Sequence, residues 1–296
     1  GLYDAFGTED FDDLYEKYEE DKSIPKQTVR AQDLFFDLLK ERAETGRIYI
    51  MNIDHCNSHS SFKDKISMSN LCQEITLPTT PIQHIDDEKG EIALCILSAI
   101  NVGALNDLSE LENLCDISVR ALDEIIDYQR YPVKAAEIST KARRSLGIGY
   151  IGLAHYLAKQ GVKYSDPKAW ELVDRLSEAF QYYLLRTSCN IAEEKGKCTA
   201  FDKTKYADGL LPIDHYKKEV DKIIPHKQRR AWESLRKDIA KYGLRHSTLS
   251  AQMPSESSSV VCNETNGIEP PRGLLSIKKS KKGPLKQIAP GYPKLK

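Results

Sequence analysis

Short apolar segments alternate with longer helical segments along this chain, and this alternation constrains its fold more than any other feature. The segment "TVRAQDLFFDLLKERAETG" has apolar residues at helical spacing and ends at Gly46, which favours a helix C-terminus. Apolar stretches predict strands at 47–53 ("RIYIMNI"), 91–103 ("EIALCILSAINVG") and 247–253 ("STLSAQM"). Further helices are expected at 107–130, at 133–144, at 229–242 and from Pro167 to Gly196. The pattern predicts an α/β fold with barrel or doubly wound layering.

Composition excludes several classes of protein. With 296 residues, of which 40% are hydrophobic and 29% charged, the chain can form one large globular domain or two ordinary ones. A net charge of −1 provides no field that would recruit nucleic acid or an anionic membrane. No apolar run approaches the roughly 18 residues of a membrane span, and no signal peptide opens the chain, so a cytoplasmic location is expected. Seven thinly spread cysteines, an odd number, are expected to be mostly free thiols.

Basic residues gather near the C-terminus, in "SIKKSKKGPLKQ". They are Lys278, Lys279, Lys281, Lys282 and Lys286. No aromatic residue is interleaved with them, so a solvated hairpin is a better interpretation than a site for a polyanion.

Three motifs have an ordinary structural interpretation beside a functional one. "GIGYIG" (147–152) matches the dinucleotide pattern, but "KARRS" precedes it instead of a buried strand, so a short strand packed closely on a neighbour is expected. "DHCNSH" offers Asp54, His55, Cys56 and His59 as metal ligands, yet a single short cluster more often forms hydrogen bonds within a loop. In "QYYLL", adjacent tyrosines on a helix point about 100° apart, which predicts one in the core and one at the surface.

Two further segments carry groups that could react or bind. If "SNLCQEITLP" is extended, Asn70, Cys72 and Glu74 share one face, whereas alone they could be a solvated acid and a small core thiol. "PSESSS" (254–259) follows the predicted strand at 247–253 and can begin a helix. Its backbone N–H groups and small hydroxyl side chains would suit a phosphate, or it is a polar turn with a serine cap.

Five motifs in one order resemble a known family. "NLCQEI", "GEIALCILSAINVG", "RRSLGIGYIG", "MPSESSS" and "NGIEPPRG" are similar to the large catalytic subunit of class I ribonucleotide reductase of enteric bacteria and their phages. The resemblance runs from Gly1 to near Lys296. It implies part of a ten-stranded α/β barrel with a central finger loop, formed here by "SNLCQEI". Residues 1–296 would then be one incomplete segment of a single catalytic barrel domain.

The resemblance also implies roles for the residues at the matching positions. Cys72 would carry a thiyl radical, Glu74 would take the proton of the substrate 3′-hydroxyl, and Asn70 would orient the substrate. Cys95 would be one member of the cysteine pair that supplies two electrons as it becomes a disulfide. The substrate diphosphate would be held by backbone amides of Pro254, Ser255, Glu256, Ser257 and Ser258.

Several parts of the family pattern are not found in this sequence. The second redox cysteine belongs upstream of Gly1, and the ATP cone, the specificity loop, the paired radical-transfer tyrosines and the C-terminal dithiol are also missing. The resemblance therefore implies no cofactor in this chain, a radical from a metal-containing small subunit, and ATP or deoxynucleotide effectors that bind elsewhere. Its expected partners are the rest of the large subunit, the small subunit, thioredoxin or glutaredoxin, and a ribonucleoside diphosphate. The alternatives are an inactive structural or partner-binding module and a nicotinamide-dependent enzyme that uses "GIGYIG".

Overall fold

The chain forms two compact units in a computed structural model that describes residues 1–225, 227–280 and 283–292. The N-terminal unit comprises residues 1–60 and 64–78, and the main unit comprises residues 61–63 and 79 onward. Each unit is described by itself. Two lysines of the C-terminal cluster, Lys281 and Lys282, lie outside the described residues.

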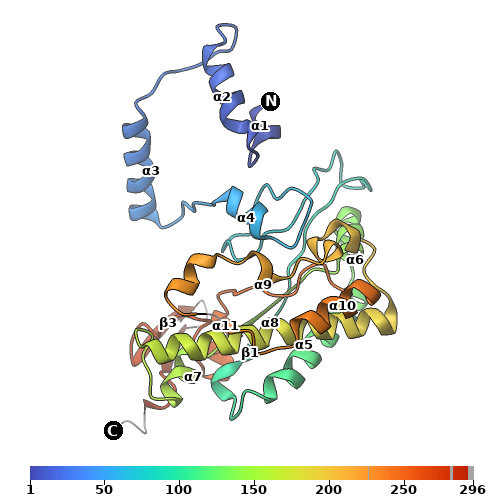
Figure 1. The fold of residues 1–296 in the computed structure, drawn as a ribbon. Coiled ribbons are helices and arrows are strands. Elements are labelled where there is room, and N and C mark those ends of the chain that lie inside the picture. Colours follow the sequence, from blue (N-terminus) through green and yellow to red (C-terminus); the bar gives the residue numbers. More distant parts are fainter. Residues whose placement is uncertain (226, 281–282, 293–296) are drawn as a thin grey trace. The chain divides into compact units, whose positions relative to one another are not determined.

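The N-terminal unit is helical. Its helices are α1 (Leu2–Ala5), α2 (Asp10–Glu20), α3 (Ala31–Thr45) and α4 (Ile53–His59) (Figure 1). Helix α3 ends at Gly46, whose φ of +64° is the left-handed conformation expected of a glycine at this place, which confirms the predicted helix end.

The strand predicted at 47–53 is wrong. Residues 47–52 have no regular structure, and α4 begins at Ile53. Helix α4 is tied to the chain that follows it by Asn57, whose side chain donates to the carbonyl of Ile66 and accepts from its N–H. An apolar run becomes a strand only beside another strand, and none of the described residues pairs with this one.

A short parallel sheet lies at the centre of the main unit. Strands β1 (Ile96–Asn101) and β2 (Leu146–Ile151) pair in parallel, with Ile96 beside Leu146. On the other side of β2 runs the segment around Ser250, which forms a parallel bridge to Ile148. The predicted strand at 91–103 is thus shorter than expected, and the one predicted at 247–253 is reduced to this bridge. The predicted strand at "GIGYIG" is confirmed.

Helices surround this sheet and confirm the α/β class. They are η1 (Val102–Ala104), α5 (Glu110–Tyr128), α6 (Lys134–Arg143), α7 (Leu153–Lys159), α8 (Pro167–Lys195), α9 (Pro212–His215), α10 (Trp232–Tyr242) and α11 (Glu256–Cys262). Helices α5 and α8 pack together, and α10 packs on α8 (Figure 1). Among the described residues the sheets have two strands each, so the chain contributes a portion of a barrel and not a closed one.

Helix α8 is covered on more than one side, which overturns one prediction. Tyr182 and Tyr183 are both buried, with exposed fractions of 9% and 5%, and their ring centroids are 5.7 Å apart. Trp232 of α10 contacts Tyr182 edge-on, and Arg230 donates to the Tyr183 hydroxyl. Neither tyrosine is therefore on the surface.

A buried network of charges joins α5 to the segments beside the sheet. The Asp123 side chain on α5 is fully buried and accepts from Arg144 Nε at 2.7 Å and from His246 Nε2 at 3.2 Å. On the other side of the His246 ring, Nδ1 lies 2.9 Å from the hydroxyl of Ser188 on α8. Burial lowers the pKa of His246, so this imidazole is neutral near pH 7 and Arg144 supplies the positive charge.

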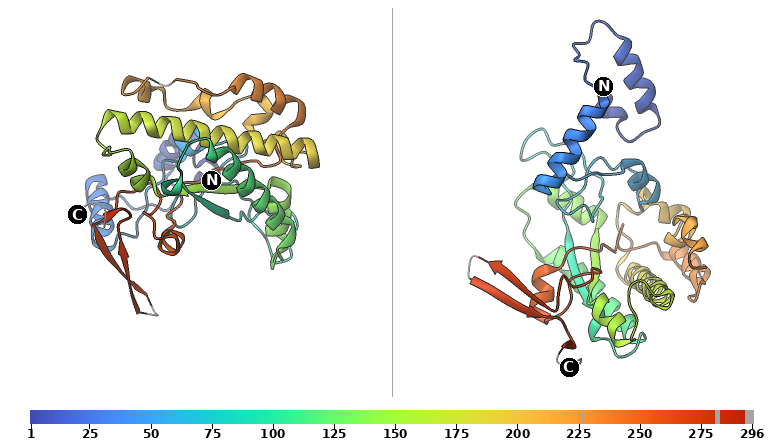
Figure 2. Two further views of the ribbon diagram at one scale, coloured as in Figure 1. Left: turned by 90° about the horizontal axis from the view of Figure 1, so that it is seen from below. Right: turned by 90° about the vertical axis from the view of Figure 1, so that its left-hand side faces the viewer.

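The C-terminal residues form an antiparallel hairpin, as predicted for the lysine-rich segment. Strand β3 (Leu275–Ser280) pairs with β4 (Gly283–Ile288), and Figure 2 shows this hairpin projecting from the rest of the main unit. Across the described ranges, no helix is long and apolar enough to cross a membrane.

Candidate functional site

The segment that carries Asn70, Cys72 and Glu74 is a tight turn. Asn70 Oδ1 accepts from the N–H of Ile75 at 3.0 Å, and the Ser69 hydroxyl donates to the Ile75 carbonyl at 2.7 Å. The N–H of Gln73 donates to the Asn70 carbonyl, and Gln73 has a φ of +61°. Cys72 lies at the tip, where it is exposed, next to Leu71 with an exposed fraction of 81%.

This turn corrects the expectation of extended backbone. Alternation of side chains requires extended conformation at every residue, and the left-handed Gln73 interrupts it between Cys72 and Glu74. The three residues are still brought together, because they belong to one closed turn. Asn70 contributes its oxygen to that closure, and Oε2 of Glu74 is shielded from solvent without a hydrogen-bond partner among the described residues.

Cys95 belongs to the main unit, where it immediately precedes β1. Ile96 and Ile100 face the core, so the alternation along the strand turns Cys95 and Leu97 to the opposite face, and both are exposed. None of the seven cysteines, all of which lie in the described ranges, is in a disulfide.

Glycines of "GIGYIG" lie on the same face of the sheet as Cys95. The register pairs Leu97 with Gly147 and Ala99 with Gly149, so this face carries small groups along β2. Gly149 has no room for a side chain, because a Cβ there would lie 2.4 Å from the carbonyl oxygen of Ala251. The first two glycines of the motif are thus inside a strand, and Gly149 allows close packing there. This arrangement gives no support to a dinucleotide-binding turn.

The "PSESSS" segment leads into helix α11, as predicted. Ser255 is buried at the helix N-cap, and its hydroxyl donates to the Met253 carbonyl without capping the first turn. Pro254, Glu256, Ser257 and Ser258 are exposed. A polar turn closed by a serine cap is therefore not what forms here.

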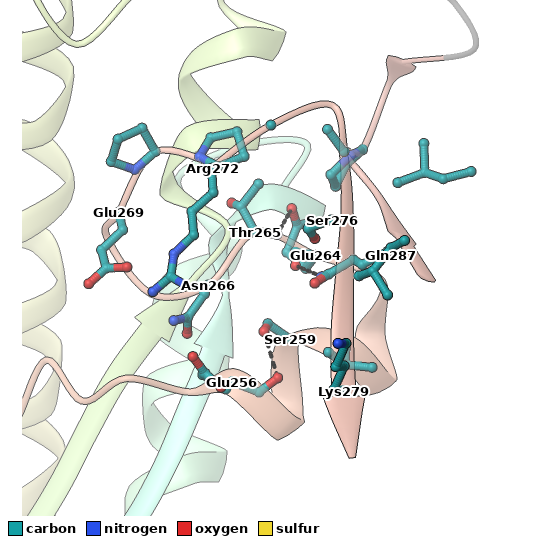
Figure 3. A pocket seen from close by; sticks show the side chains of 18 residues that line it. Glu256, Ser259, Glu264, Thr265, Asn266, Glu269, Arg272, Ser276, Lys279 and Gln287 are labelled. Carbon is teal, nitrogen blue, oxygen red and sulfur yellow. Dashed lines mark hydrogen bonds between the residues drawn. The ribbon is translucent and has the colours of Figure 1, made fainter. Parts of the chain in front are cut away.

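A cavity of about 350 Å³ lies between α11, the loop that follows it and the hairpin (Figure 3). Glu256 and Ser259 line it from α11, and the Arg272 side chain reaches toward Asn266 across it. Among the predicted site residues, Glu256 alone lines this cavity. Thr265 Oγ1 and Asn266 Oδ1 are buried in its wall without a partner in the described part of the chain.

The possible metal ligands of "DHCNSH" lie on the short helix α4. His59 Nδ1 is within hydrogen-bond distance of the His55 carbonyl and of the Ser58 hydroxyl, as expected for hydrogen-bonded residues. Within the described ranges, no three His, Cys, Asp or Glu side chains are grouped closely enough to hold a metal ion.

Comparison with known proteins settles the family. Residues 1–294 match the family model described as "Ribonucleotide reductase, barrel domain". The chain belongs to the ribonucleotide reductase barrel family. It is 57% identical over its whole length to the ribonucleoside-diphosphate reductase subunit alpha of Haemophilus influenzae, and 55% identical over 99% of its length to subunit alpha of reductase 1 of Escherichia coli K12. The corresponding subunit of enterobacteria phage T4 is 43% identical over 97% of the chain.

This ribonucleotide reductase chain spans about two fifths of the length of those relatives, namely 40%, 39% and 38%. Its predicted site residues are divided between the units: Asn70, Cys72 and Glu74 in the N-terminal unit, Cys95 and 254–258 in the main unit.

Sequence reasoning missed one polar pair at the reductase sheet. His155 on α7 and Glu264 after α11 are 2.9 Å apart, and the Glu264 side chain is nearly fully buried. The signal available in the sequence was Gly152, the last glycine of "GIGYIG", which lies against Glu264.

Proposed function

We propose that this chain is the active-site segment of the large subunit of a ribonucleoside-diphosphate reductase, which reduces ribonucleoside diphosphates to deoxyribonucleoside diphosphates. The observation that carries the proposal is the closed turn 69–75, which presents the Cys72 thiol at an exposed tip with Glu74 two residues away. The relatives named ribonucleoside-diphosphate reductase subunit alpha support it over the whole chain.

The chemistry begins with a thiyl radical at Cys72, generated from a partner small subunit. The sulfur removes the hydrogen atom from C3′ of the ribose, because S–H and activated C–H bonds are similar in strength. Glu74 takes the 3′-hydroxyl proton, for which its Oε2 is suited because it has no hydrogen-bond partner among the described residues. The amide nitrogen of Asn70 would orient the substrate.

Reduction requires two electrons and an acid. The 2′-hydroxyl leaves as water after it is protonated, and Cys95 with a second cysteine outside this chain gives up two electrons and two protons as they form a disulfide. The hydrogen atom then returns from Cys72 to C3′, which regenerates the thiyl radical. Thioredoxin or glutaredoxin would reduce the disulfide for the next turnover.

The diphosphate of the substrate would bind at residues 254–258. Backbone N–H groups at the start of α11 suit an anion, and the hydroxyl of Ser255, turned to the Met253 carbonyl, does not compete for them. Effectors would bind in other parts of the large subunit, and synthesis of deoxyribonucleotides would take place in the cytoplasm.

The test is Cys72→Ser in the complete large subunit that contains this sequence, assayed with its small subunit. Serine keeps the size of the side chain, but its O–H bond is too strong to return a hydrogen atom by the same route. We expect loss of reduction with binding of the ribonucleoside diphosphate nearly unchanged. Substantial turnover by the variant would remove Cys72 from the radical step.

A second candidate is an inactive partner-binding module. Helix α3 has no buried residue, and its apolar side chains Leu34, Phe35 and Phe36 are each at least 58% exposed. Such a face suits contact with further polypeptide. The same assay separates the candidates, because a module would show no reduction even with the unaltered Cys72.

A further inference from the structure

A buried carboxylate occupies the carboxyl end of the parallel sheet. Glu264 follows α11, and its side chain is 4% exposed. Its Oε2 lies 2.9 Å from His155 Nδ1 on α7, and its Oε1 accepts from the N–H of Thr265 at 2.9 Å. A buried carboxylate is costly unless such partners satisfy it, so this arrangement is specific.

Two glycines form the slot that receives this side chain. Gly103 follows β1 and Gly152 follows β2, so they mark the ends of the two strands. A Cβ on Gly103 would lie 2.5 Å from Oε2 of Glu264, and a Cβ on Gly152 would lie 2.8 Å from its Cγ. Gly152 also has a φ of +83°, which favours glycine there. The last glycine of "GIGYIG" thus makes room for a carboxylate of the chain itself.

Backbone groups of Glu264 also bind α11 and the hairpin. Its N–H donates to the carbonyl of Ser259 in α11, and its carbonyl accepts from Gln287 Nε2 of β4 (Figure 3). The adjacent Thr265 accepts from the N–H of Gly152 at 2.9 Å. One residue therefore connects α11 and the hairpin to the ends of the sheet strands.

The side chain of Glu264 is not needed to end the helix. Asn263, with a φ of +49°, already terminates α11 in the left-handed conformation, and its N–H bonds back to Val260. The end of α11 therefore does not account for the buried carboxylate.

We propose that Glu264 and His155 are positioning residues that fix α11, and through it the diphosphate-binding segment 254–258, against the ends of β1 and β2. This inference rests on the proposed function. Helix α11 is only seven residues long, so a shift at its C-terminal end moves its first turn almost equally.

The experiment compares Glu264→Ala and Glu264→Gln in the complete large subunit, with its small subunit present. Alanine removes both side-chain contacts, whereas glutamine can still accept from Thr265 N–H and can donate to His155 Nδ1 in the tautomer that carries its proton on Nε2. We expect alanine to raise KM and the dissociation constant for the ribonucleoside diphosphate about tenfold, the effect of losing roughly one hydrogen bond to the diphosphate. Glutamine should stay within about twofold of the wild type, and kcat should change little in either variant, as for loss of uniform binding.

A second pair of variants tests the slot. Gly103 lies in the helical turn η1, a conformation open to alanine, and the atoms closer than 3.0 Å to an added Cβ all belong to Glu264. Gly103→Ala should therefore weaken substrate binding by displacing Glu264. In the double variant Gly103→Ala/Glu264→Ala the clash with Glu264 is gone, and His155, whose Nδ1 lies 3.0 Å from the added Cβ, is no longer held by that carboxylate. Binding should therefore be no weaker than in Glu264→Ala alone.

The outcomes separate this inference from the proposed function. If the wild-type subunit binds no ribonucleoside diphosphate, the proposed function fails. If it binds and Glu264→Ala binds equally well, the positioning role is overturned, even if the variant melts at a lower temperature. The role is also overturned if glutamine is as damaging as alanine, or if the two alanine substitutions weaken binding additively.

Discussion

Asp123→Asn should destabilise the main unit far more than Asp127→Asn, although both carboxylates lie on α5 and both bind Arg144. Asp123 is fully buried, whereas the Asp127 side chain is 51% exposed. Arg144 is itself only 5% exposed, so removal of Asp123 leaves buried positive charge with the half-exposed Asp127 as its remaining carboxylate. Loss of one member of a buried ion pair costs about 3–5 kcal/mol, while an exposed pair contributes about 0–1 kcal/mol.

The loss of stability in Asp123→Asn relative to wild type should also depend on pH. Burial disfavours the charged form of Asp123, but the hydrogen bond from His246 and the charge of Arg144 outweigh it and lower the pKa of this carboxyl. A lowered pKa contributes stability that is present above the unfolded pKa near 3.8 and lost as pH falls through the folded pKa. The stability gap between wild type and Asp123→Asn should therefore stay nearly constant from pH 7 to about pH 5 and narrow as the pH falls below the unfolded pKa near 3.8.

Urea unfolding of the chain at pH 7 and at lower pH measures both effects, with Asp127→Asn as the matched control. An equal loss of stability in the two variants, or a loss below about 1 kcal/mol for Asp123→Asn, would refute the reasoning that burial decides the strength of this pair.

Two further outcomes are expected for the proposed site. Single changes Ser257→Ala and Ser258→Ala should each weaken binding of the ribonucleoside diphosphate by only about 1 kcal/mol, because backbone groups hold the phosphate; a much larger loss in a binding titration would mean that the hydroxyls hold it. Under mild oxidation the isolated chain should form no specific bridge from Cys95 to Cys56, Cys115, Cys189, Cys198 or Cys262. Burial raises the pKa of Cys115 and Cys189 to about 12 and that of Cys198 to about 11, so these three thiols stay protonated and poorly reactive near pH 7. Peptide mapping that finds a bridge from Cys95 to one of the five cysteines would place the redox pair within this chain.

Elements with local signals could be predicted from the sequence. Gly46 ends α3, Pro167 begins α8 and Gly196 ends it, because caps depend on residues that are neighbours along the chain. The strand predicted at 47–53 was wrong because a strand depends on a partner strand from elsewhere in the chain. The prediction that one of Tyr182 and Tyr183 is at the surface was wrong for a similar reason. Helical spacing cannot reveal that Trp232 and Arg230 cover a second side of α8.

The residues of the candidate site were assigned by resemblance, and the shape of the segment that carries three of them could not be predicted. The roles of Cys72 and Cys95 came from the resemblance, whereas the left-handed Gln73 broke the expected alternation of side chains. Glu264 gave no local signal, because "CNETNG" is polar enough to lie at the surface. Its burial depends on Gly103 and Gly152, which are far away in sequence.

In the turn from Ser69 to Ile75, the shape of the tip that carries Cys72 and the position of that tip depend on different residues. Two side chains within the turn, Ser69 and Asn70, close it onto the backbone of Ile75, so its internal geometry is encoded by consecutive residues. The rest of the protein then determines only the position of this turn. Substitutions there can shift the thiol as a rigid group, while a change at Ser69 or Asn70 would reshape the tip itself.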